Sequence, residues 1–273
     1  MPVTSPSSSI LVEVDGPVCR VVMNRPKSLN ALNLELMDTM AVVMRDISND
    51  DSIRCVVLSG AGDHFMAGGD IKHFGARLEA VPDRTAFRHE IEAMINGFHE
   101  TVIHMRAMPK PIIASVRGAV AGAGVSIMLA CDLVVATESS FYTLAYSHLG
   151  TSPDGGSTFS LPRATGMKRA MEIALLGDRF DVVTAERWGL VNRVVADGKL
   201  DTETETLAAR LAAGPTHAYA HTKALMNESL SNTLHQQLDA ETLAFADCAV
   251  TDDFNEGVTA FNDKRKPEFK GRY

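Results

Sequence analysis

The stretch PIIASVRGAVAGAGVSIMLACD, residues 111–132, decides the fold. Its opening is typical of a buried strand, its middle is a loop of glycine and alanine, and its end has a helical pattern. The stretch CVVLSGAGDHFMAGGDIKHF, residues 55–74, has the same design. Two such loops facing each other would hold an oxygen atom between two backbone amides, as an oxyanion hole does. Close packing of a helix on a strand explains either loop taken alone.

Strand and helix patterns also alternate towards the N-terminus. ILVEVDG and VCRVVMNR alternate apolar and polar residues on either side of residues 15–16, which predicts a hairpin. Asn33 is placed to cap a helix whose apolar residues run to Ile47. A long helix is expected after Asp83, and it ends before Pro109. Alternating strands and helices indicate a mostly parallel α/β fold.

The chain divides into three regions by composition and pattern. Residues 1–9, rich in serine and proline, predict a disordered tail. Residues 10–200 carry the alternating pattern and predict an α/β core. Residues 201–273 show helical patterns only, and a helical region of this kind packs on its own core or on a neighbouring subunit.

Composition excludes several classes of protein. The 273 residues are 45% hydrophobic and 22% charged, as in an ordinary soluble protein. The longest apolar region, residues 119–136, is interrupted by Ser126 and Asp132, so no segment is expected to span a membrane. The first residues lack the basic start and apolar run of a signal peptide. The net charge of −8 argues against general binding to nucleic acid.

The four cysteines are far apart and form no CxxC pair; they are Cys19, Cys55, Cys131 and Cys248. This spacing is typical of buried, reduced thiols in a cytoplasmic protein. No spacing of histidine, cysteine and aspartate indicates a metal site.

Five segments resemble, in the same order, signature segments of the crotonase (enoyl-CoA hydratase/isomerase) superfamily. The resemblance extends from about Leu11 to Arg272. The segments are NRPKSLNALN at 24–33, HFMAGGDIK at 64–72, KPIIASVRGAVAGAGVSIMLACD at 110–132, GTSPDGGSTFSLPRATG at 150–166 and AFNDKRKPEFKGR at 260–272.

The resemblance implies a crotonase fold of stacked ββα turns with C-terminal helices that drive trimerisation. A homotrimer or a dimer of trimers is therefore expected. The implied substrate is an acyl-CoA thioester, and no separate cofactor is expected because coenzyme A is part of that substrate. The thioester carbonyl would be polarised by two backbone N–H groups, which the resemblance assigns to Gly69 and Ala123. The family most often has glycine at the second place, and alanine keeps the N–H.

Further positions match segments of the family that contact the substrate. The resemblance implies that Phe261 and Lys264 reach coenzyme A from a neighbouring subunit, where the basic C-terminal end of the chain would meet an anionic ligand. The candidate substrate-binding residues are Lys27, Ser28, Ala31, Ala67, Asp70, Ile71, Tyr146, Phe261 and Lys264.

The carboxylates distinguish the reactions within the family. Typical hydratases use two glutamates, and the matching positions here are Ser126 and, allowing a slip of one residue, Ala145 or Tyr146. Asp154 stands where several members place a functional aspartate. Without the resemblance, SPDGG would be a turn with a structural aspartate. With it, one carboxylate favours an enoyl-CoA isomerase that shifts a double bond through a thioester enolate, with Asp154 as acid and base.

Other functions remain open. An enoyl-CoA hydratase is the main alternative. His99 lies near the position where an aryl-CoA dehalogenase carries its base, but the only tryptophan, Trp188, is not at that enzyme's aromatic position. His99 is also explained as an ordinary, partly buried histidine. His148 is expected near the acyl pocket without a defined direction. A non-catalytic acyl-CoA-binding protein is a further alternative.

Overall fold

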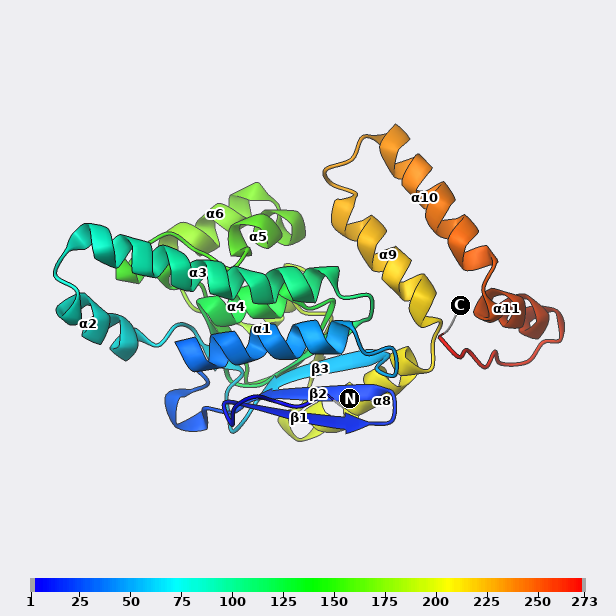
Figure 1. Cartoon of the computed structure of the whole chain (residues 1–273), viewed down its shortest axis with the longest axis horizontal. Helices are drawn as coiled ribbons and strands as arrows, with labels where there is room; N and C mark the ends of the chain where they lie inside the picture. The colour runs from blue at the N-terminus through cyan, green and yellow to red at the C-terminus, as the bar shows by residue number, and fades with distance from the viewer. Residues whose placement is uncertain (1–2, 272–273) are drawn as a thin grey trace.

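Two sheets hold the strands of this α/β protein, whose computed structural model describes residues 3–271 (Figure 1). The strands are β1 (Ile10–Asp15), β2 (Val18–Met23), β3 (Cys55–Gly60), β4 (Met66–Ala67), β5 (Ile112–Val116), β6 (Ala119–Ala121), β7 (Leu133–Thr137), β8 (Phe141–Thr143), β9 (Phe180–Asp181) and β10 (Arg193–Val195). The α-helices are α1 (Leu34–Ser48), α2 (Ile71–Ala80), α3 (Arg84–Ala107), α4 (Ala123–Ala130), α5 (Ser157–Thr165), α6 (Met167–Leu176), α7 (Val182–Arg187), α8 (Leu200–Ala212), α9 (Thr216–Glu228), α10 (Leu234–Ala249) and α11 (Asp252–Asn262). The short 3-10 helices are η1 (Pro26–Ser28), η2 (Tyr146–Leu149) and η3 (Asp197–Lys199).

The larger sheet has the strand order β1-β2-β3-β5-β7-β10, and only β1 runs antiparallel to its neighbour. The hairpin predicted around residues 15–16 is confirmed as the β1–β2 pair. The smaller sheet has the order β4-β6-β8-β9. Strands β3 and β4 are followed by α2, β5 and β6 by α4, and β7 and β8 by η2 and α5. These repeated units confirm the predicted stack of ββα turns.

Alternating side chains bury both faces of the larger sheet. In β3, Val56 and Leu58 pack in the cluster that contains α1, whereas Cys55 and Val57 pack with α8. This follows from the period of two in a strand. Figure 1 shows α1 and α3 over one face and α8 over the other. The predicted cap at Asn33 is also confirmed, since its side chain accepts from Leu36 N. The structure adds a second cap at Asp83, whose side chain accepts from Thr85 N.

Residues 3–9 are packed, in place of the disordered tail that their composition predicts. Val3 is buried in the main core, and Ser9 Oγ lies 3.4 Å from Thr39 Oγ1 of α1. The serine hydroxyls are satisfied by one another and by Thr39, so a polar segment lies against the helix without leaving buried groups unpaired. Residues 1, 2, 272 and 273 lie outside the described part of the chain.

Helix α8 belongs to the core, although its residues fall in the region predicted to be a separate helical part. Leu200, Leu207 and Ala208 are buried against the larger sheet. The part that leaves the core therefore begins at α9, after residue 214, and α9, α10 and α11 extend to one side (Figure 1). Among residues 3–271, no helix combines the length and apolar character needed to cross a membrane.

Three of the four cysteines are buried, as predicted. Cys19, Cys55 and Cys131 are buried, whereas Cys248 on α10 is only half-buried. Burial raises the pKa of the Cys19 and Cys55 thiols to about 12. These two thiols are therefore poor nucleophiles at neutral pH.

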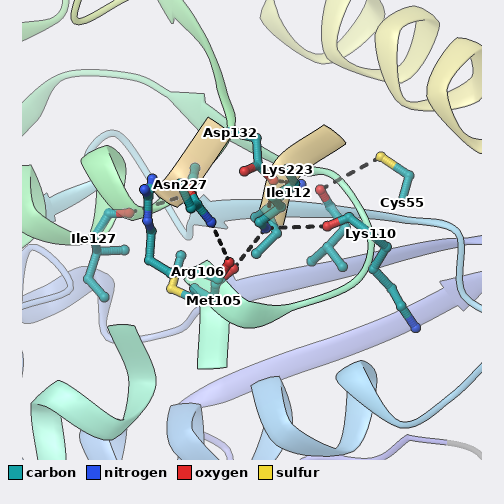
Figure 2. A network of polar contacts seen from close by, with 11 residues as sticks. Cys55, Met105, Arg106, Lys110, Ile112, Ile127, Asp132, Lys223 and Asn227 are labelled. Atoms are coloured by element: carbon teal, nitrogen blue, oxygen red, sulfur yellow. Dashed lines mark hydrogen bonds and ion pairs between the residues drawn. The ribbon is translucent and has the colours of Figure 1, made fainter. Parts of the chain in front are cut away.

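A buried lysine fastens α9 to the core. Lys223 Nζ lies 2.8 Å from Asp132 Oδ2 and donates to the backbone oxygens of Met105 and Lys110 (Figure 2). Asp132 Oδ2 also accepts from Ile112 N at 2.8 Å. Burial lowers the pKa of Lys223, while the Asp132 carboxylate acts in the opposite direction. One cation thus joins α9 to the end of α3 and to the strands β5 and β7.

Replacement of Lys223 by methionine is expected to destabilise the protein by about 1–3 kcal/mol, because the half-buried Asp132 loses its cation and two backbone oxygens lose a charged donor. Denaturant-induced unfolding at a fixed protein concentration measures this loss. Lys168→Met, on the exposed surface of α6, is the matched control and should change stability by less than about 0.5 kcal/mol. Equal effects of the two substitutions would contradict the role of Lys223.

Candidate active site

Two loops of small residues meet where β4 and β6 end. Ala67 pairs with Ala121 in the smaller sheet, so the residues that follow them lie side by side. A Cβ added at Gly122 would lie 3.5 Å from Gly68 Cα. Both glycines have positive φ, +88° at Gly68 and +48° at Gly122, which side chains disfavour. The two stretches singled out in the sequence therefore do face each other.

Gly69 and Ala123 line one cavity of about 540 Å³. Ala123 is the first residue of α4, where an N–H has no acceptor within the helix. Within residues 3–271, neither amide donates to the backbone network outside the regular elements. Two such donors at one wall form a site for an anionic oxygen.

The rest of the cavity wall is mainly apolar and comes from α1, α2 and α3. Apolar walls exclude water, and the lower local dielectric constant strengthens electrostatic interactions inside a site. The apolar side chains that line it include Leu32, Met37, Ile71, Phe74, Ile91, Met94, Ile95, Phe98 and Leu149. Helix α3 thus forms much of this wall.

Asp154 is the only carboxylate among the described residues that line this cavity. It sits just before α5, and its backbone oxygen accepts from Ser126 Oγ at 2.9 Å and from Ser157 Oγ at 3.0 Å. Both serines are buried. The backbone of Asp154 is therefore held from both sides, and its side chain is directed by a fixed main chain.

The Asp154 carboxylate has one close side-chain partner. Tyr146 donates its hydroxyl to Asp154 Oδ1 at 2.5 Å. Burial raises the pKa of Asp154 above its usual range, while the Tyr146 hydrogen bond and nearby His99 act to lower it. Burial and the Asp154 charge also raise the pKa of Tyr146, so the phenol remains the donor. The site therefore holds an aspartate that accepts a proton more readily than a solvated one.

His99 contacts the backbone next to Asp154. Gly155 N donates to His99 Nε2 at 3.3 Å. Gly155 has φ +59°, and an added Cβ would lie 2.3 Å from a ring carbon of Phe98. His99 thus helps to hold the loop of Asp154. His148 is exposed and lies beside Gly177, where an added Cβ would be 3.0 Å from its Nε2.

Ser126 lies at the site, although the sequence singled it out only because typical hydratases have a glutamate at the matching position. Its hydroxyl supports the backbone of Asp154, and its side chain is buried between α4 and the loop before α5. Spacing along the chain did not indicate this contact, because 28 residues separate the two partners.

The candidate residues near the N-terminus lie in a segment that is joined to β4, the strand before the first loop of small residues. Lys27 and Ser28 are exposed in η1, and Ala31 is buried close to them. Ala67 N donates to Leu29 O at 3.0 Å, which joins this segment to β4. Ile71 is 51% exposed and also lines the cavity, so an apolar group entering from solvent would meet it first.

Asp70 has structural partners. Its carboxylate lies 2.9 Å from Arg25 Nη2, and it accepts from His73 N at the start of α2. Burial raises the pKa of Asp70, but the Arg25 and His73 hydrogen bonds outweigh this and lower it. Arg25 also donates to Ala31 O. Asp70 therefore fixes the loop that carries Gly69.

Phe261 and Lys264 are separated from the cavity within one chain. Both lie at the end of α11, which Figure 1 places on the opposite side of the molecule from α2. Phe261 is 83% exposed. The structure brings together Gly69, Ala123, Tyr146 and Asp154, but not these two residues.

A larger hollow of about 770 Å³ lies between α3, α5 and α9. Its wall includes Gly155 and Ser126, but the described residues that line it include neither Gly69 nor Ala123. The smaller cavity is therefore the better candidate, since it combines two amide donors with a carboxylate.

The chain is similar to known proteins over nearly its whole length. Residues 13–272 match the family model for enoyl-CoA hydratase/isomerase. The chain is 36% identical to 1,2-epoxyphenylacetyl-CoA isomerase of Escherichia coli, over 96% of this chain and 98% of that protein. It is 34% identical to a protein of Rhodobacter capsulatus named "Probable enoyl-CoA hydratase", over 97% and 98%. A crystal structure of an enoyl-CoA hydratase from Polaromonas sp. JS666 superposes with a TM-score of 0.88 at 35% identity, covering 96% of this chain and 99% of that one.

Gly155→Ala is expected to destabilise the protein because the new methyl group meets Phe98 and Ser126 at a positive φ. The left-handed backbone costs about 1–2 kcal/mol and the overlap about 1–3 kcal/mol more. Gly150→Ala is the control, since its φ is +70° but nothing lies within 4 Å of an added Cβ. Urea unfolding of both variants separates the two contributions, and equal losses would contradict the tight packing at Gly155.

Proposed function

Because the chain belongs to the enoyl-CoA hydratase/isomerase family of the crotonase superfamily, we propose that it is an enoyl-CoA isomerase that moves a double bond along an acyl-CoA thioester. One observation carries this proposal: a single carboxylate, Asp154, lies in a cavity with two backbone amide donors. A proton shift within one molecule needs one group that takes the proton and returns it.

In the proposed reaction the thioester oxygen accepts hydrogen bonds from Gly69 N–H and Ala123 N–H. These donors stabilise the negative charge that develops on the oxygen when C2 loses a proton. The Asp154 carboxylate takes this proton from C2 of a 3-enoyl thioester and returns it to C4. The electron pair of the C2–H bond forms the C2–C3 double bond, and the former C3–C4 double bond takes the proton. No water or separate cofactor is consumed.

The surroundings of Asp154 support this role. Burial raises its pKa, which makes its carboxylate a stronger base, and Tyr146 limits the rise by donating to the charged form. The main chain of Asp154 is held by Ser126 and Ser157. A base on a fixed backbone can reach both C2 and C4 of one substrate, which are separated by a single carbon, with little rearrangement.

Hydration is the second candidate because the R. capsulatus relative is named for it. Hydration of a 2-enoyl thioester requires activation of water and delivery of a proton to C2, for which typical family members use two glutamates. Here Ser126 occupies one of those positions and donates to the backbone of Asp154. Asp154 alone remains in the cavity, and this favours the isomerase.

The proposal includes binding of coenzyme A across subunits of a homotrimer or a dimer of trimers. Lys27, Ser28, Ala31, Ala67 and Ile71 would contact coenzyme A on their own subunit. Phe261 and Lys264 would reach it from a neighbour, because α11 is remote from the cavity of its own chain. Large apolar side chains exposed on α10 and α11 fit burial between subunits; they include Leu234, Leu238, Leu243, Phe245, Phe254, Val258 and Phe261.

Asp154→Asn is expected to lower kcat for conversion of 3-hexenoyl-CoA to 2-hexenoyl-CoA by about 10²–10⁴-fold, with a small change in KM, because the amide cannot take the C2 proton. The absorbance of the conjugated thioester measures the product. Asp178→Asn, on the exposed surface, is the control. Full activity of Asp154→Asn, or hydration of crotonyl-CoA faster than isomerisation, would contradict the proposal.

Tyr146→Phe is expected to move the acidic limb of the pH profile of kcat/KM to higher pH. The Tyr146 hydrogen bond lowers the pKa of Asp154, so its removal lets burial raise that pKa further, and the active carboxylate is then lost at a higher pH as the solution is acidified. Initial rates from pH 4 to 9 measure the midpoint. A midpoint that stays in place or falls would show that Tyr146 does not tune Asp154.

A further inference from the structure

Three potential metal ligands meet outside the catalytic cavity, where α9 packs on α10. His217 and His221 lie four residues apart on α9, and Cys248 lies near the end of α10. One donor atom from each residue lies within 4.8 Å of the other two. The spacing along the sequence indicated no metal site, because Cys248 is 27 residues beyond His221 and only the packing of the two helices brings it close.

The two imidazoles have the geometry of a metal-binding pair. His217 Nε2 and His221 Nε2 are 3.2 Å apart, and their rings are nearly perpendicular at 85°. Two nitrogen ligands at about 2.0–2.1 Å from a tetrahedral Zn²⁺ are separated by about 3.3 Å. The observed separation therefore allows both nitrogens to bind one ion with little movement.

The three side chains are of the kinds that bind Zn²⁺ in proteins. Imidazole nitrogen and cysteine sulfur are its commonest ligands, and the sulfur binds as the thiolate.

The surroundings of the three residues offer a path for an ion, but the nearby Asp253 is not available as a fourth ligand. The Asp253 carboxylate accepts from Lys270 N and Gly271 N at 2.7 and 2.8 Å, so both of its oxygens are already used. All three potential ligands are half-buried. His221 also lines the larger hollow between α3, α5 and α9, which provides a path for an ion from solvent.

We propose that His217, His221 and Cys248 bind a divalent transition-metal ion, best matched by Zn²⁺, that joins α9 to α10. Nitrogen and sulfur ligands favour Zn²⁺ over the oxygen-seeking ions Mg²⁺ and Ca²⁺. Three protein ligands leave one tetrahedral position for a water molecule. None of the three residues lines the cavity of Asp154, so the ion has no part in the proposed isomerase reaction. It stabilises the helical pair that extends from the core.

The test uses untagged, full-length protein that has been treated with EDTA, dialysed and reduced with a phosphine. Zn²⁺ is added, and metal that remains bound after gel filtration is measured by mass spectrometry. We expect about one Zn²⁺ per chain and a higher Tm, because an ion that binds only the folded state stabilises it. Co²⁺ in place of Zn²⁺ should give a thiolate-to-metal charge-transfer band.

Two variants remove single ligands. His221→Gln and Cys248→Ala should each bind Zn²⁺ at least about tenfold more weakly, since even outer-shell changes cost that much in metal sites. Cys248→Ala should also abolish the charge-transfer band. His235→Gln is the matched control, because His235 is an exposed histidine of α10 outside the cluster. Circular dichroism without metal checks that the variants fold.

Two outcomes would overturn the proposal. One is wild-type protein that takes up no Zn²⁺ at micromolar concentration. The other is binding that both ligand variants retain, which would be an adventitious ion only. Isomerase activity of the metal-free protein is expected to match that of the loaded protein, so the result of this test is independent of the proposed reaction.

Discussion

The close contact between Gly68 and Gly122 is the constraint on which the site depends. A side chain at either position would meet the backbone of the other loop or adopt a disfavoured positive φ. With two glycines there, the residues that follow them, Gly69 and Ala123, line the same cavity. The parallel pairing of β4 with β6 sets this approach, and the ion pair of Arg25 with Asp70 holds the first loop in place.

The candidate acid depends on a balance of opposing contributions. Burial raises the pKa of Asp154, whereas the hydroxyl of Tyr146 lowers it. Ser126 and His99 contact the main chain of residues 154 and 155, and these contacts hold the loop that carries the carboxylate. A separate set of contacts attaches the C-terminal helices to the core. There, Lys223 fastens α9 to the core, and it does not line the cavity of Asp154.

Much of the fold was predictable because local patterns and global packing agree. The hairpin at residues 15–16, the cap at Asn33 and the helix after Asp83 were each indicated by a few neighbouring residues. The prediction of a disordered tail was wrong for residues 3–9, because composition does not reveal that serine hydroxyls form hydrogen bonds with α1. The predicted boundary between the core and the C-terminal helical region, at residue 200, lies before the point where the chain leaves the core. Helical periodicity does not indicate which surface a helix covers, and α8 covers the larger sheet.

By itself, the sequence determined the two loops of small residues, the single aspartate among family motifs and the absence of the two hydratase glutamates. Only the tertiary structure decided that Ser126 and His99 hold the loop of Asp154, that Asp70 is occupied by Arg25, and that Cys248 meets two histidines. The physical reason is sequence separation. Periodicity and capping act over a few residues, whereas these contacts join elements that are brought together only when the sheets and helices pack.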